Sequence, residues 1–135
     1  MTVRWDFDHA NRFVYVTAEG DVYVQEVLDC YDRFVVQDAM SYAKLWDATT
    51  ATLRFSDEDV MTLGAWTSAY AEFEPRGPIA IVAVTDDCRD MMRRYMGVAH
   101  AKRPLRLFSS VDHARKWLDV EMSLRKPSVT AQRPS

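Results

Sequence analysis

Carboxylate and hydroxyl side chains gather directly after two apolar segments of the chain. They are Asp47, Thr49, Thr50, Ser56, Thr85 and Asp86. If both apolar segments are parallel strands, these side chains follow the carboxyl ends, where open α/β sheets bind ligands. They would then form a polar rim that hydrogen-bonds a small ligand. The alternative, which we favour, is that they bond to the backbone locally and tie down their own loops.

Ser56 has a second interpretation. It stands three residues before Asp59, the spacing of a capping box, with Asp where Glu or Gln is usual. Its side chain is therefore expected to cap a helix that begins at the next residue.

Other reactive groups give no catalytic pattern. The chain has only four glycines and lacks both a glycine-rich phosphate loop and a Gly-x-Ser-x-Gly motif. Cys30 and Cys88 lie on or beside apolar helical stripes, so we expect buried structural thiols. His9, His100 and His113 are scattered and do not match a zinc-binding spacing. We therefore expect a protein that is not an enzyme and has no cofactor or metal site.

Composition is that of one ordinary globular domain. The 135 residues carry 17 basic and 20 acidic side chains, a net charge of −3. The acidic excess lies before residue 75, and we expect folding to mix it with the basic second half. An acidic chain without a basic and aromatic motif disfavours nucleic-acid binding. No apolar run approaches the roughly 20 residues of a membrane span, and the start lacks a signal segment, so we expect a cytoplasmic protein.

The elements that must position these residues follow from hydrophobic periodicity. Strands are predicted at 3–8, 13–19, 42–47, 79–84 and 105–108, and helices at about 21–37, 56–73, from 85, and from 109. Strands that alternate with helices predict an α/β fold with a largely parallel sheet. The opening hairpin makes this a mixed sheet of about five strands with about four helices. Residues 1–122 form the predicted domain, and residues 123–135 a flexible C-terminal tail.

The second predicted helix has an unusually wide apolar surface. A narrow face of mostly small side chains, which includes Gly64, suits close packing on the sheet. A second stripe lies beside it and comprises Leu63, Trp66, Tyr70 and Phe73. If exposed, this stripe would bind a partner protein or a second copy of the chain as a homodimer. Alternatively, another helix or the tail covers it, and the sequence leaves both interpretations open.

The order of elements resembles the SpoIIAA-like proteins, relatives of the STAS domains of bacterial anti-sigma-factor antagonists. The matching residues are Glu19-Gly20, Leu45-Trp46-Asp47, the Ile79–Val84 strand and a closing segment from Leu107 to Leu118. The resemblance implies a single-domain SpoIIAA-like fold over roughly residues 3–121. In the antagonists a serine of an Asp-Ser-Ser-Gly motif is phosphorylated. Only Ser56 matches here, and three acidic residues follow it, so we favour a cap over a phosphorylation switch.

Three functional hypotheses follow. The favoured one is non-enzymatic protein binding, through self-association or a regulatory partner. The second, implied by the fold relationship to Sec14-type domains, is a carrier of a small apolar or anionic ligand or a lipid, which enters between the second and third helices. Such a carrier needs a cavity of at least about 300 Å³. The third is a phosphorylation-regulated antagonist that acts through Ser56.

Overall fold

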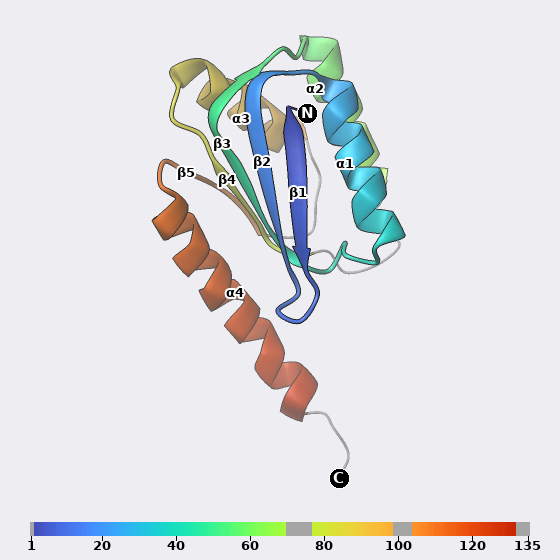
Figure 1. Cartoon of the computed structure of the whole chain (residues 1–135), viewed down its shortest axis with the longest axis vertical. Coiled ribbons are helices and arrows are strands. Elements are labelled where there is room, and N and C mark those ends of the chain that lie inside the picture. The colour runs from blue at the N-terminus through green and yellow to red at the C-terminus, as the bar shows by residue number, and fades with distance from the viewer. Residues whose placement is uncertain (1, 70–76, 99–103, 132–135) are drawn as a thin grey trace.

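The computed structural model describes residues 2–69, 77–98 and 104–131, and for residues 98 and 125–131 it describes the backbone alone. The strands are β1 (Val3–Asp8), β2 (Phe13–Val22), β3 (Ala43–Leu53), β4 (Ile79–Val82) and β5 (Leu105–Phe108). The helices are α1 (Val24–Val36), α2 (Asp57–Ala69), α3 (Asp86–Val98) and α4 (Val111–Ala131). The predicted α/β fold with a mixed sheet of five strands is confirmed (Figure 1).

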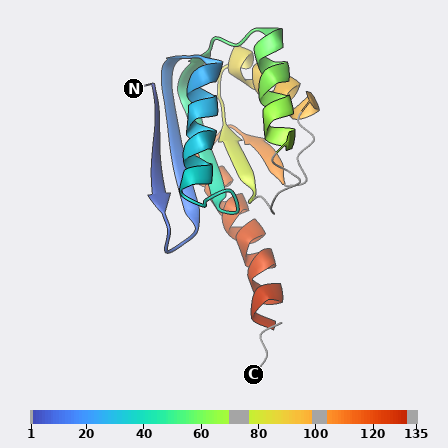
Figure 2. The ribbon, with the colours of Figure 1, turned by 90° about the vertical axis from the view of Figure 1, so that its right-hand side faces the viewer.

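The strands lie side by side in the same order as in the sequence, β1-β2-β3-β4-β5. β1 pairs with β2 antiparallel, and the remaining neighbours are parallel. Each parallel connection therefore moves one position in the same direction across the sheet. Because such crossovers are right-handed, all three connecting helices must lie on one face. Figure 2 shows α1, α2 and α3 on that face, and α4 covers part of the other.

Alternation along the strands divides the buried side chains into two layers. Val14, Val16 and Ile81 point toward α1, α2 and α3 and belong to the larger core. Phe13, Leu45 and Val82 point the other way and pack with Ala114 and Leu118 of α4. Such β-branched and aromatic side chains suit strands that are covered on both faces. The side chains of the predicted polar rim therefore do not all lie on the same face of the sheet.

β3 is longer than the predicted strand at 42–47. After a β-bulge beside Thr17, the strand continues through a threonine-rich stretch, and Leu53 pairs with Val22. Gly20 lies in the corresponding part of β2 with a positive φ of 66°, which glycine tolerates readily. The expectation that Asp47 ends a strand was therefore wrong. It lies in the middle of β3, because threonine favours strands and β2 provides a partner for the extension.

The turn that leads into β3 is closely packed. Lys44 is fully buried, and its Nζ donates hydrogen bonds to the carbonyls of Met40 at 2.8 Å and Tyr42 at 2.9 Å. The backbone N–H of Gly77 donates to the Met40 carbonyl at 3.0 Å. This turn therefore joins the end of α1 to the segment that enters β4.

α4 extends beyond the sheet in both views (Figures 1 and 2). Its helix continues to Ala131, past the predicted end of the domain at residue 122. The flexibility of residues 123–135 stays a prediction. Among the side chains that the structure describes in α4, which reach residue 124, Leu118 is the last buried one, and Leu124 is 69% exposed.

Candidate functional site

A groove of about 360 Å³ lies at the carboxyl edge of the sheet, between the end of β3 and the start of α3. Thr52, Leu53 and Arg54 form one side, and Thr85 and Arg94 are among the residues of the other. The position agrees with the general rule that open α/β sheets bind ligands beyond the carboxyl ends of their strands. This groove is therefore the candidate ligand site.

The predicted rim reaches the groove only in part. Thr85 lines it, and its Oγ accepts a hydrogen bond from the backbone N–H of Cys88 at 3.2 Å, which caps α3. Asp86 is exposed in the first turn of that helix. Ser56 caps α2, as the capping-box spacing predicts. Its Oγ accepts from the N–H of Asp59 at 3.0 Å, and its own N–H donates to the Asp59 carboxylate at 2.9 Å.

Asp47 belongs to a separate cluster on the α4 face of the sheet. The Tyr15 hydroxyl donates to one carboxylate oxygen at 2.8 Å, and the N–H and Oγ of Thr49 donate to the other at 3.2 and 2.8 Å. Burial and the hydrogen bond to Asp47 raise the pKa of Tyr15 to about 12. Thr50 is exposed further along β3. Asp47 and Thr49 thus make the local bonds of the favoured interpretation and take no part in the groove.

Two arginines supply positive charge at the groove, and each has an acidic neighbour. Arg94 pairs with Asp57 of α2 at 3.1 Å, and Arg54 pairs with Asp21 at 3.1 Å. All four side chains are more than half exposed. Such surface pairs contribute only about 0–1 kcal/mol, so both guanidinium groups can reorient toward a ligand at little cost.

The four residues of the stripe predicted on the second helix do not share one exposed surface among those that the structure describes. Leu63 is 4% exposed and belongs to the core, so it cannot serve as a surface contact. Trp66 is half-buried, and its ring centroid lies 5.8 Å from that of Tyr31 on α1. Tyr70 and Phe73 lie outside the described residues. Helix α1 thus approaches one side of α2, as the alternative interpretation anticipated.

The outward face of α2 has a feature that the stripe did not include. Met61 is 58% exposed, and Ala65 and Ala69, each one turn further along, are exposed as well. No charged residue occurs from Val60 to Ala71. This uncharged run is the feature of the sequence from which a contact surface on α2 could have been predicted. The sequence interpretation overlooked Met61 because it considered only the aromatic side chains. Met61, Ala65 and Ala69 are called the outer face of α2 below.

Comparison with solved structures identifies the fold. An anti-sigma factor antagonist from Mycobacterium paratuberculosis superposes with a TM-score of 0.58 and 18% identity, over 87% of this chain and 93% of that one. A second structure, from Shewanella loihica, is an uncharacterised protein of the DUF3478 family with a SpoIIAA-like fold. It gives a TM-score of 0.54 at 15% identity, over 86% of this chain and 91% of that one. The fold is SpoIIAA-like.

The likeness is one of architecture. No family model matches the chain, and no curated protein matches it. At such low identity a SpoIIAA-like fold does not by itself establish an activity. In the part of the chain that the structure describes, none of the helices is both long and apolar enough to cross a membrane.

The two cysteines of this SpoIIAA-like domain are buried, as predicted. Burial raises the pKa of Cys30 to about 12 and also raises the pKa of Cys88 above its usual value. Both side chains therefore remain neutral thiols at physiological pH, which makes them poor nucleophiles. Among the described residues there is also no group of three or more side chains arranged to hold a metal ion.

An apolar cavity of about 50 Å³ lies between the sheet and helices α1, α2 and α3. It is far smaller than the roughly 300 Å³ that a site for a drug-sized ligand requires. This cavity therefore has no room for a lipid, whereas the groove of about 360 Å³ exceeds the volume that the carrier hypothesis requires.

Proposed function

We propose that this SpoIIAA-like domain acts by binding protein, and that it first binds a second copy of itself through the outer face of α2. The observation that carries the proposal is an exposed helix face without charge over about two turns, from Met61, which is 58% exposed, to Ala69. Contact surfaces differ from the rest of a protein surface in their depletion of charge and enrichment in methionine.

A second copy suits this face better than an unrelated partner does. In a symmetric dimer each residue on the interface meets its own copy or a reciprocal neighbour, so like charges near the axis would repel. The outer face of α2 carries no such charges. The small side chains of Ala65 and Ala69 would let two α2 helices approach closely, and Met61 would fill the remaining gaps.

A regulatory role is the second part of the proposal. One structure with this fold is an anti-sigma factor antagonist, a protein that acts through another protein. A regulatory protein partner would bind either the dimer or the outer face of α2 that the dimer otherwise covers. The buried, neutral thiols and the capping roles of Ser56 and Thr85 agree with a binding function rather than catalysis.

The test is the mass of the protein in solution across a concentration series, measured by light scattering. We expect the wild-type mass to rise toward that of a dimer. Met61→Asp and Ala65→Asp should remain monomeric, since each places a charge at the interface while the exposed site tolerates it in the folded monomer. Val36→Asp is the matched control, because Val36 on α1 is 70% exposed and lies outside this face.

Self-association would be refuted by a wild-type protein that stays monomeric at the highest concentration. Equal effects of Met61→Asp and Val36→Asp would show that the outer face of α2 is not the contact.

A further inference from the structure

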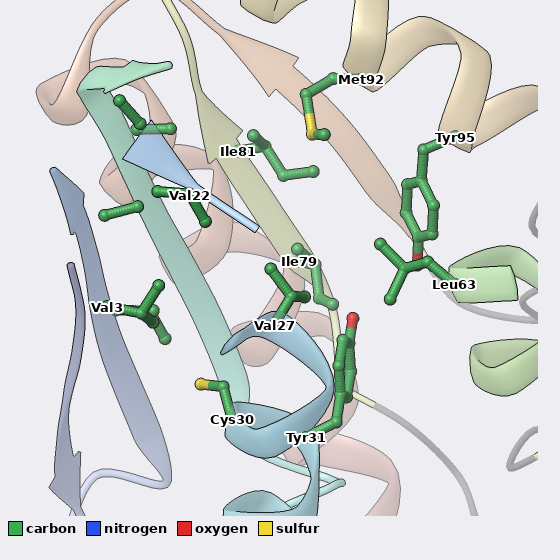
Figure 3. Close-up of a cluster of buried hydrophobic side chains, with 14 of the residues drawn as sticks. Val3, Val22, Val27, Cys30, Tyr31, Leu63, Ile79, Ile81, Met92 and Tyr95 are labelled. Atoms are coloured by element: carbon green, nitrogen blue, oxygen red, sulfur yellow. The ribbon is translucent and has the colours of Figure 1, made fainter. Parts of the chain in front are cut away.

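The small apolar cavity is lined by side chains from the sheet and from helices α1, α2 and α3. Figure 3 shows Tyr31 of α1, Leu63 of α2 and Tyr95 of α3 around Ile79 and Ile81 of β4. α1 meets α2 through the rings of Tyr31 and Trp66, and the cavity lies beneath this contact. It therefore fills the space where α1 diverges from the α2–α3 pair.

The lining offers almost no polar partner. The one polar group of Tyr95, its hydroxyl, donates to the Oγ of Thr67 at 3.2 Å, and that Oγ in turn bonds to the carbonyls of Leu63 and Gly64. Water is stable in a cavity only where it finds two to four polar partners. A volume of about 50 Å³ would accommodate roughly three or four water-sized probes, yet it offers them little to bond. Apolar cavities of this kind stay dry and accept benzene or xenon when large enough.

The cavity also has a neighbour through which a ligand can arrive. Leu53 lines both the cavity and the groove at the carboxyl edge. On α3, Met91 lines the groove and the next residue, Met92, lines the cavity. Leu53 and Met91 are each half-buried, and methionine is unbranched and changes rotamer readily. The two spaces are therefore adjacent, with the apolar side chains of Leu53 and Met91 between them.

We propose that this cavity is a binding site for a small, uncharged, apolar molecule of a few heavy atoms, which enters from the groove past Leu53 and Met91. The ligand class is that of xenon, dissolved apolar gases and the shortest hydrocarbons. It is distinct from the protein contact proposed at the outer face of α2. A bound molecule would contact α1, α2 and α3 together and would stabilise the folded state by mass action.

The experiment uses xenon under pressure as the probe, with NMR spectra of the methyl groups of the full chain. Saturable shifts are expected at Val27, Leu63 and Ile81, and no comparable shift at Val82 and Leu118 of the α4 layer. Ala48 lines the cavity, so Ala48→Val should abolish the shifts. Thr50→Val is the matched control, because it adds a β-branched apolar residue at an exposed position of the same strand. Its shifts should equal those of wild type.

A second cavity-filling variant, Ala18→Val, protects the test against a folding defect in the first. The melting temperature gives a separate readout: xenon should raise it in wild type and in Thr50→Val, and leave it unchanged in the filled variants. Replacement of Leu53 by Trp should slow or prevent the shifts by closing the entrance. The proposal is overturned if wild type shows no saturable shifts, or if the shifts survive in both filled variants. Normal exchange in Leu53→Trp would overturn the entrance.

Discussion

Ser56 and Asp59 exchange two hydrogen bonds at the start of α2, and this pair should act as a structural cap. We expect Ser56→Ala to lower the free energy of unfolding by about 0.5–2 kcal/mol, because it leaves a helix N–H without its partner. Ser56→Asp should retain most of the stability, since aspartate also caps helices well. Denaturant titration measures both. An unchanged stability of Ser56→Ala would mean that the serine is retained for another role, and labelling of Ser56 by a partner kinase would favour the switch.

Tyr15 should make the protein sensitive to alkaline pH. Its pKa is raised from the ordinary value of 10 to about 12, because burial and the Asp47 carboxylate disfavour the phenolate. The folded state then holds this proton more tightly than the unfolded state. The resulting stability is fully present below pH 10 and is lost as the pH rises toward 12. We expect Tyr15→Phe to show a shallower loss of stability over this range, measured by thermal melts at several pH values. An identical slope in both proteins would contradict the shifted pKa.

At the scale of the elements, two glycines give opposite expectations. A Cβ on Gly77 would clash with the backbone of Ser41 and Tyr42, whereas one on Gly97 in α3 would meet no atom within 4 Å. Gly77→Ala should therefore destabilise the fold by about 2 kcal/mol or more. Gly97→Ala should stabilise it by about 0.5–1 kcal/mol, since glycine is unfavourable in a helix. Thermal unfolding of the two variants checks this, and a tolerated Gly77→Ala would exclude the tight turn.

How far the sequence predicted these elements depended on whether their signals were local. The cap at Ser56 and the buried cysteines followed from residues within one or two helical turns. The local bonds from Thr49 to Asp47 were also anticipated, but the bond from Tyr15 was not, because it joins residues 32 positions apart and depends on the register of β2 with β3. The same pairing explains why the length of β3 was underestimated. Leu63 was assigned to a surface because the sequence alone does not show where α1 lies.

At the scale of the whole molecule, the projecting half of α4 should be dispensable for stability. Among the side chains that the structure describes in this helix, which reach residue 124, the buried and half-buried ones all precede residue 123: Val111, Ala114, Trp117, Leu118, Glu121 and Met122. A chain that ends at Ser123 should change its melting temperature by less than about 4 °C, the effect of roughly 1 kcal/mol in a domain of this size. Leu118→Ala is the comparison, with an expected cost of about 2–5 kcal/mol. A large fall on truncation would show that residues 124–135 stabilise the domain.

The overall architecture was predictable because alternating strand and helix patterns allow few arrangements, and right-handed crossovers select among them. The outer face of α2 and the small cavity could not be predicted, since both depend on how three helices pack against one another on the sheet. Periodicity identifies which residues are apolar, but the distance between neighbouring helices is a property of the packed structure.

The sequential order of the strands has a consequence for how the domain is made. Each new strand pairs with the one that left the ribosome before it, so the sheet can grow by addition at a single edge during synthesis. No strand has to insert between two strands that are already paired. Only the β1–β2 hairpin is a local pairing; each parallel pairing closes a loop over a connecting helix, so we expect the parallel part of the sheet to form more slowly than the hairpin. In this order of synthesis α4 follows β5, and it covers the apolar residues of β3, β4 and β5 that face away from the other helices. Until then this surface stays open to chaperones and to aggregation.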